Sequence, residues 1–168
     1  DGHYTMVEVI KAQLKEAAED HRVKAVILKV DSPGGEVLAS DEINRLISEF
    51  QKKHGKPVVA SMGNLAASGG YYVSAPCRWI VANELTITGS IGVIMSSWNY
   101  RGLMNKVGVV PQVYKSGQFK DMLSGSREMT QEEKDYIQGL VMQTYGIFVG
   151  IVARERHLDE AALRAGIA

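Results

Sequence analysis

The sequence has little cysteine and no excess of charge of either sign. Cys77 is the one cysteine among 168 residues, so no disulfide can form within the chain and the redox compartment stays open. We expect Cys77 to be a buried structural thiol. Lysine plus arginine and aspartate plus glutamate both number 19, which argues against the clustered basic face that nucleic acid binding needs. We therefore expect no nucleic acid partner.

The sequence also lacks a targeting segment and a long apolar run. Its most apolar stretch, residues 140–152, is interrupted by Gln143 and Thr144, whereas a membrane-spanning helix needs about 20 apolar residues. No linker, repeat or low-complexity tract divides the chain. We interpret residues 1–168 as a single domain excised from a longer protein.

Short β-branched runs alternate with helical periodicities along the chain. This alternation predicts an α/β fold with mostly parallel strands and flanking helices. The predicted strands are residues 23–30, 57–62, 79–82, 91–95 and 109–114, and the predicted helices are residues 4–20, 36–53, 68–75, 100–107 and 130 to about 155. Thr130 and Glu133 have the spacing of a capping box at the start of the last helix.

Three glycine-rich turns, at residues 34–35, 69–70 and 89–92, follow predicted strands. Glycine is needed where the backbone takes a positive φ or comes close to another group. Any one of these turns could be a simple tight turn. Their occurrence at the ends of successive strands indicates a site, because ligands of α/β sheets bind at those ends.

Ser68 lies in the second of these turns, between small neighbours, where a strand gives way to a helix. The start of a helix offers unpaired N–H groups and a partial positive charge, which suit an oxyanion. Ser68 is therefore a candidate nucleophile. The alternative is that its hydroxyl merely caps the following helix.

A serine nucleophile needs a base, and the histidines do not supply an evident one. The chain contains His3, His21, His54 and His157, none of which lies in a glycine-rich turn. A Ser-His-Asp triad is therefore poorly supported, although the order of residues in the chain does not exclude it. The Ser-x-x-Lys and Gly-x-Ser-x-Gly motifs are absent. Histidine, cysteine and acidic residues also show no metal-ligand spacing, so no metal is implied.

Lysine is the remaining candidate for the base. An ordinary lysine has a pKa near 10.4 and is protonated at neutral pH, but burial in an apolar pocket can lower that pKa by roughly 3–5 units. Lys115 and Lys120 both follow the predicted strand at residues 109–114. Lys120 ranks first because it follows a glycine turn and Phe119, whose ring could exclude water. The alternative is an ordinary solvated lysine.

Four segments together resemble the signal peptide peptidase A family. They are residues 26–35 (VILKVDSPGG), 56–63 (KPVVASMG), 66–72 (AASGGYY) and 88–94 (TGSIGVI), in matching order and spacing. The resemblance covers nearly the whole chain. It implies a ClpP/crotonase-like fold of stacked ββα units. It departs from the family in lacking a strand before the first helix, a further segment after residue 168 and a membrane anchor.

The resemblance also implies roles for single residues. Ser68 corresponds to the nucleophile and Lys120 to the general base of a Ser-Lys dyad. The Gly35 N–H is expected to join the Ser68 N–H in the oxyanion hole, and the Ser90 hydroxyl is expected to orient the Lys120 amine. No cofactor is implied.

The function implied by the resemblance is that of a serine endopeptidase at the bacterial membrane, with its catalytic domain on the extracytoplasmic side. Its substrates would be cleaved signal peptides and similar unfolded peptides. Membrane association would come from a segment absent from this chain. We also expect a homo-oligomer with sites at subunit interfaces, in which Lys120 is ordered and desolvated near Ser68 only in the assembly.

Three other functions remain open at this stage. The protein could be a membrane-bound ClpP-class protease that cuts a stomatin-like partner, because the motifs of the two groups overlap. It could be a crotonase-type CoA-thioester enzyme, which would need a catalytic acid in the pocket; Asp31 and Glu36 are the acids near the glycine turns. It could also be a non-catalytic assembly module that uses the apolar face of the last helix.

Overall fold

The computed structural model describes residues 4–166, which divide into two compact units. The sheet unit consists of Asp1–Gly92 and Gly146–Ala168, and the α4 unit consists of Val93–Tyr145. The single domain expected from the sequence stays a prediction.

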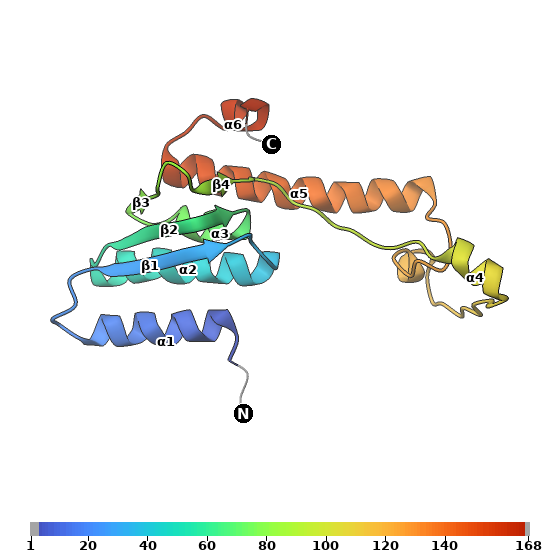
Figure 1. The fold of residues 1–168 in the computed structure, drawn as a ribbon, viewed down its shortest axis with the longest axis horizontal. Coiled ribbons are helices and arrows are strands. Elements are labelled where there is room, and N and C mark those ends of the chain that lie inside the picture. The colour runs from blue at the N-terminus through green and yellow to red at the C-terminus, as the bar shows by residue number, and fades with distance from the viewer. Residues whose placement is uncertain (1–3, 167–168) are drawn as a thin grey trace. The chain divides into compact units, whose positions relative to one another are not determined.

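The sheet unit is built on four parallel strands (Figure 1). They are β1 (Val26–Ser32), β2 (Val58–Ala67), β3 (Trp79–Val81) and β4 (Ile87–Gly89). Strand β2 is central: β1 pairs with one edge, while β3 and β4 pair with its first and last parts. The predicted α/β class with a mostly parallel sheet is confirmed.

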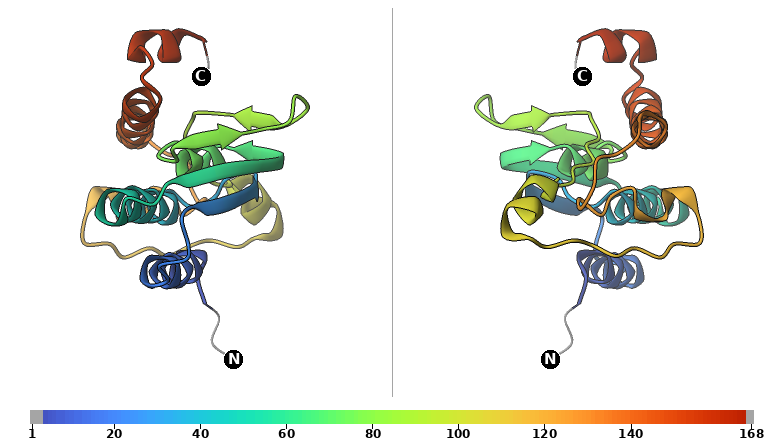
Figure 2. Two further views of the ribbon diagram at one scale, coloured as in Figure 1. Left: turned by 90° about the vertical axis from the view of Figure 1, so that its left-hand side faces the viewer. Right: turned by 90° about the vertical axis from the view of Figure 1, so that its right-hand side faces the viewer.

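Helices α1 (Met6–Glu19), α2 (Val37–His54) and α3 (Gly69–Ser74) belong to the same unit. Figure 2 shows α2 and α3 on one side of the strands. Ile47 of α2 and Val58 and Ala60 of β2 are fully buried in the core between these layers. Cys77 is also buried there, as predicted, and burial raises the pKa of its thiol to about 12.

The α4 unit contains α4 (Arg101–Val107), the 3₁₀ turn η1 (Gln118–Asp121) and the first part of α5 (Gln131–Arg156). The rest of α5 belongs to the sheet unit, where the Phe148 ring lies 4.8 Å from that of Tyr72. Helix α6 (Glu160–Gly166) follows α5. The predicted capping box is confirmed, because the Thr130 N–H donates to Glu133 and the Glu133 N–H donates to the Thr130 hydroxyl.

Two predicted strands, residues 91–95 and 109–114, are wrong. Neither segment is a strand, and between residues 4 and 166 neither pairs with another strand. Their apolar side chains include Ile94, Val110 and Tyr114, which are 91%, 79% and 93% exposed. A β-branched run becomes a strand only when a neighbouring strand accepts and donates its backbone hydrogen bonds, and no strand among the described residues does so here.

Helix α5 is the one helix among residues 4–166 that is long and apolar enough to cross a membrane. The mean hydropathy of its 18-residue window is 1.4, and 17% of that window is buried. The prediction against a span depended on residues 140–152, a shorter stretch than the helix that contains them. The core helix of a soluble protein meets the same criteria of length and composition.

Candidate active site

Ser68 occupies a strained turn between the end of β2 and the start of α3. Its backbone dihedrals are φ 51° and ψ −120°, a region that residues with a side chain rarely adopt and that costs of order 1–3 kcal/mol. Strain of this kind gathers at functional sites. The Ser68 side chain makes no capping hydrogen bond to α3, so helix capping does not account for a serine at this position.

The backbone amide of Ser68 is already occupied. Its N–H donates to the carbonyl oxygen of Gly89 at 2.9 Å, and its own carbonyl accepts from the Tyr72 N–H. This hydrogen bond conflicts with the expected role of the Ser68 N–H in the oxyanion hole. The next amide, that of Gly69, is the first of α3 and has no partner within the helix. It is the better donor for an oxyanion beside Ser68.

The glycine pair after β1 packs directly against this turn. A Cβ on Gly34, whose φ is 108°, would lie 2.8 Å from the Ser68 Cβ and 2.8 Å from the Gly69 nitrogen. A Cβ on Gly69 would lie 3.1 Å from the Gly35 nitrogen. The Gly34 N–H donates to the Ser32 hydroxyl at 3.1 Å, which holds the glycine turn. The Gly35 and Gly69 amides are therefore close neighbours at the Ser68 turn.

The third glycine turn completes the cluster within the sheet unit. Ser90 follows Gly89, the residue that accepts the Ser68 amide, and Ser90 also has a positive φ of 51°. The Thr88 hydroxyl donates to the Ala66 carbonyl at 2.7 Å, which fixes the end of β4 to the end of β2. Three residues expected in the site, Ser68, Gly35 and Ser90, thus lie on turns that touch or bond one another.

Asp31 supports this cluster in a way that sequence reasoning did not find. The pairing of β1 with β2 skips from Val30–Met62 to Ser32–Ala66, so residues 63–65 bulge opposite Asp31. The Asp31 carboxylate accepts from the Leu65 N–H at 3.2 Å. A Cβ on Gly63 would lie 2.8 Å from the Asp31 Cγ. The sequence shows an acid at a strand end before a glycine turn. The bulge whose backbone this acid binds is formed by the partner strand β2, so it could not be predicted from the residues around Asp31.

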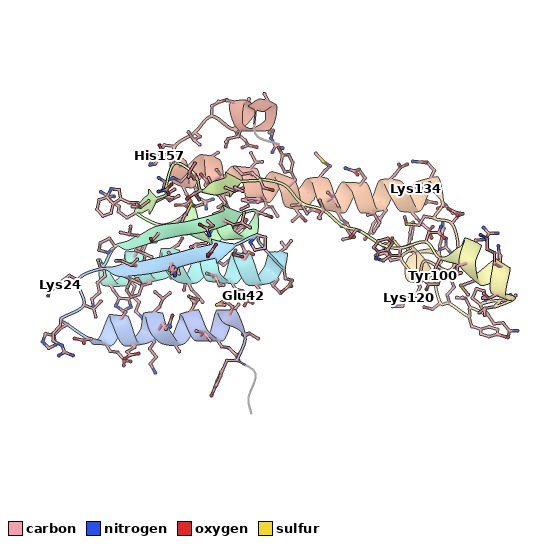
Figure 3. The ribbon with its side chains drawn as sticks, in the orientation of Figure 1. Lys24, Glu42, Tyr100, Lys120, Lys134 and His157 are labelled. Carbon is pink, nitrogen blue, oxygen red and sulfur yellow. The ribbon has the colours of Figure 1, made fainter. Side chains whose placement is uncertain are left out.

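Lys120 lies in the α4 unit, on the turn η1 (Figure 3). Its side chain is exposed, and its backbone N–H donates to the Gly117 carbonyl at 3.2 Å. Lys115 differs, because its ammonium lies 2.8 Å from the Asp121 carboxylate and 3.2 Å from the Gln118 carbonyl oxygen. The Lys115 amine is thus engaged within its own loop, and the preference for Lys120 stays a prediction.

The described residues offer no metal site and no evident histidine base. Among residues 4–166, no group of three histidine, cysteine or acidic residues could hold a metal ion. His54 ends α2, with its ring 5.5 Å from that of Phe50. His157 is exposed after α5, and His3 lies outside the described residues.

Comparison with known proteins identifies the class. Residues 50–166 match the model of peptidase family S49. The chain therefore belongs to peptidase family S49, a protease family with a ClpP-like fold, which agrees with the parallel α/β sheet described above. The family resemblance seen in the four sequence segments is confirmed.

Individual relatives make the comparison more specific. The chain is 47% identical over 152 residues to a protein of Enterococcus faecium named "Putative signal peptide peptidase SppA", covering 90% of this chain and 44% of that protein. It is 37% identical over 153 residues to "Protease 4" of Haemophilus influenzae, covering 91% and 25%. It is 34% identical over 158 residues to "Serine protease SPPA, chloroplastic" of Arabidopsis thaliana, covering 94% and 23%. The chain thus spans less than half of the length of each of these three relatives.

Proposed function

We propose that this protein is a serine endopeptidase with Ser68 as its nucleophile. The observation that carries the proposal is the strained turn of Ser68, enclosed by Gly34 on one side and Gly89 on the other. A turn of this shape presents a hydroxyl at the end of a parallel sheet without burying it under its own helix. Membership of a protease family and relatives named as proteases support the same function.

In the proposed reaction the Ser68 Oγ attacks the scissile carbonyl carbon. The neutral amine of Lys120 takes the hydroxyl proton as the new C–O bond forms, and the carbonyl oxygen becomes an oxyanion. Lys120 then delivers that proton to the leaving amine, the C–N bond breaks and an acyl-enzyme remains. Water, deprotonated by the same amine, attacks the ester carbonyl carbon. The C–O bond to Ser68 breaks, the Lys120 ammonium returns its proton to the Ser68 Oγ, and the carboxylic acid product leaves.

The N–H groups of Gly35 and Gly69 would bind the oxyanion. Both belong to glycines packed at the Ser68 turn, and the Gly69 amide has no partner within α3. Removing one donor of this kind costs about 10²–10³ in kcat in enzymes that use one. The Ser90 hydroxyl, on the turn after Gly89, would orient the Lys120 amine.

Lys120 must lose water to act as a base at neutral pH, and its side chain is exposed in the single chain. We therefore propose that assembly into a homo-oligomer buries Lys120 near Ser68. The lysine of each site would come either from the subunit that contributes Ser68 or from an adjacent subunit. Mixed oligomers of Ser68→Ala and Lys120→Ala protein separate these two cases. Recovered activity means that dyads form across subunits, and no recovery from well-mixed oligomers means that each site is built within one chain.

The proposed substrates are cleaved signal peptides and other unfolded peptides, on the extracytoplasmic side of a bacterial membrane. The support is the resemblance to signal peptide peptidase A and the name of the Enterococcus relative. Membrane attachment would come from a part of the protein outside this chain. Profiling of cleaved peptides distinguishes broad cutting of apolar segments from cleavage at one dominant site in a stomatin-like partner.

A CoA-thioester function is less well supported by the geometry. The Asp31 carboxylate accepts from the Leu65 N–H, so it has a structural role rather than the free position of a catalytic acid. A fluorophosphonate probe tests the choice directly. Covalent labelling of Ser68 supports the protease, while failure to label together with saturable CoA binding contradicts it.

The decisive experiment compares purified full-length variants in a peptide cleavage assay. Ser68→Ala and Lys120→Ala should each abolish turnover while circular dichroism and thermal unfolding stay close to the parent protein. Lys134→Ala, a change at another exposed lysine of the α4 unit, is the matched control and should retain activity. Turnover by either of the first two variants would remove that residue from the reaction.

A further inference from the structure

The turn that carries Lys120 is fastened to the start of α5 by the side chains of its other residues. The Gln118 amide donates to the Glu132 carboxylate at 2.8 Å. The Phe119 ring lies 5.4 Å from the Tyr136 ring. Within residues 4–166, the Lys120 side chain alone in this turn has no hydrogen bond, ion pair or ring contact.

Asp121, the residue next to Lys120, is enclosed by two cations. Its carboxylate accepts from the Arg127 guanidinium at 2.6 and 3.0 Å and from the Lys115 ammonium at 2.8 Å. Its side chain is only 12% exposed. Hydrogen bonds from Arg127 and then Lys115 hold the pKa of Asp121 well below its usual range.

Arg127 continues the connection into α5. Its guanidinium also donates twice to the Glu133 carboxylate, which is fully buried and caps the helix through the Thr130 N–H at 2.8 Å. Arg127 and the Thr130 backbone lower the pKa of Glu133 to about 2. The cluster Lys115, Asp121, Arg127 and Glu133 therefore holds two positive and two negative charges, all paired.

We propose that Arg127 and Asp121 are positioning residues for Lys120: their ion pair fixes the η1 turn on α5, and Arg127 keeps the Asp121 carboxylate from pairing with the neighbouring amine. The inference depends on the proposed role of Lys120 as the base. An opposite charge within about 4–6 Å favours a protonated amine. If Arg127 were lost, the freed Asp121 carboxylate would stabilise the Lys120 ammonium, and less of the enzyme would carry a neutral base at neutral pH.

Few charged groups face the turn, so the effect of the Asp121 carboxylate on Lys120 can be separated from the effects of the others. They are Lys115 and Arg127 on the flanking segments, Asp121 on the turn itself, and Glu132 and Glu133 on α5. Glu132 is engaged by Gln118, and Glu133 by Arg127. Removal of Arg127 would leave both Asp121 and Glu133 with unfilled bonds. Of these two carboxylates, Asp121 is the one next to Lys120 in the chain, and the Asp121→Asn change below separates its effect from that of Glu133.

The test measures the pH dependence of kcat/KM for the full-length protein in its native assembly. Arg127→Met keeps an apolar stem but loses both ion pairs. We expect it to move the acid limb of the profile upward by about one pH unit and to lower kcat about tenfold at neutral pH, with KM little changed. Arg127→Met with Asp121→Asn should return the limb toward its original position, because the freed carboxylate is gone.

Lys134→Met is the matched control, because it removes an exposed positive charge of the same unit without touching the cluster. It should leave the profile unchanged. Lys115→Met removes one of the two cations and should shift the limb in the same direction by less, which keeps the test informative if Arg127→Met does not fold. An acid limb that stays in place in both the Arg127 and Lys115 variants would overturn the inference.

The inference would also be overturned if the acid limb of the double variant moved as far as that of Arg127→Met. The shift would then come from a disturbed turn and not from the freed Asp121 carboxylate. These results are distinct from a failure of the proposed function. If Lys120→Ala remains active, the base has been misassigned. If Lys120→Ala is inactive while Arg127→Met behaves like the parent protein, Lys120 remains the proposed base and only the positioning role of Arg127 is contradicted.

Discussion

The N–H of Ser68 donates to the carbonyl oxygen of Gly89 at 2.9 Å, which joins the turn after β2 to the turn after β4. The bond lies directly between the proposed nucleophile and Ser90, the residue that follows Gly89. Because Thr88 also bonds Ala66, the two strand ends cannot shift independently. The position of Ser68 is therefore determined by a neighbouring strand as much as by its own.

Replacement of Gly34 by alanine should damage the site more than the fold. The new Cβ would meet the Ser68 Cβ and the Gly69 nitrogen at 2.8 Å, and φ is 108°. We expect a loss of about 1–3 kcal/mol in the free energy of unfolding from backbone strain, and a fall in kcat/KM of about 10²-fold or more through the displaced oxyanion donor. Thermal unfolding and fluorophosphonate labelling of Ser68 measure the two effects.

Gly102→Ala is the control for that experiment. Gly102 lies in α4, with no atom within 4 Å of a Cβ built on it and no positive φ. Alanine there should slightly stabilise the helix. Equal labelling of Ser68 in the Gly34 variant and the control would contradict the packing described for the site.

Asp31 should act through the β2 bulge rather than through substrate. Asp31→Ala leaves the Leu65 N–H without its acceptor, and we expect a loss of about 1 kcal/mol in unfolding free energy together with slower labelling of Ser68. Asp31→Asn keeps a side-chain oxygen for the same bond and should restore most of both. If Asp31→Asn is as impaired as Asp31→Ala, the carboxylate has a further role that the hydrogen bond does not explain.

Much of this site could be anticipated from local sequence. Local sequence predicts features whose residues lie close together in the chain. These are the glycine turns, the position of Ser68 between a strand and a helix, and the Thr130–Glu133 capping box. The sequence did not reveal that the Ser68 amide, the expected oxyanion donor, bonds Gly89, a residue brought near by strand pairing. The run at residues 109–114 has strand composition, but no described neighbour pairs with it. Where the partner lies far away in the chain, local pattern is insufficient.

Acid should loosen the turn that carries Lys120 before it unfolds the sheet unit. The pKa values of Asp121 and Glu133 are both lowered in the folded protein by Arg127, so their contribution to stability is fully present above their unfolded values, about 3.9 and 4.3. It is lost as pH falls through that range toward the folded values. Amide hydrogen exchange in η1 and the start of α5 should therefore accelerate below about pH 4.

Asp121→Asn is the comparison for that measurement. It removes one of the two acid-sensitive carboxylates, so exchange in η1 should depend less on pH than in the parent protein. Exchange at β2, whose residues are far from both carboxylates in the chain, serves as the internal reference. An acid dependence in η1 that the variant does not weaken would contradict the role given to this ion pair.

Glycine at position 68 should make the protein more stable and inactive. The backbone of Ser68 has φ 51° and ψ −120°, which glycine adopts without the side-chain penalty. Ser68→Ala keeps a Cβ and therefore keeps the strain. We expect Ser68→Gly to exceed Ser68→Ala by about 1 kcal/mol in unfolding free energy, after the greater backbone entropy of unfolded glycine is subtracted. Ser96→Gly, at an exposed residue without a positive φ, should show no such gain over Ser96→Ala. Equal stabilities of the two Ser68 variants would mean that the nucleophile turn stores no strain.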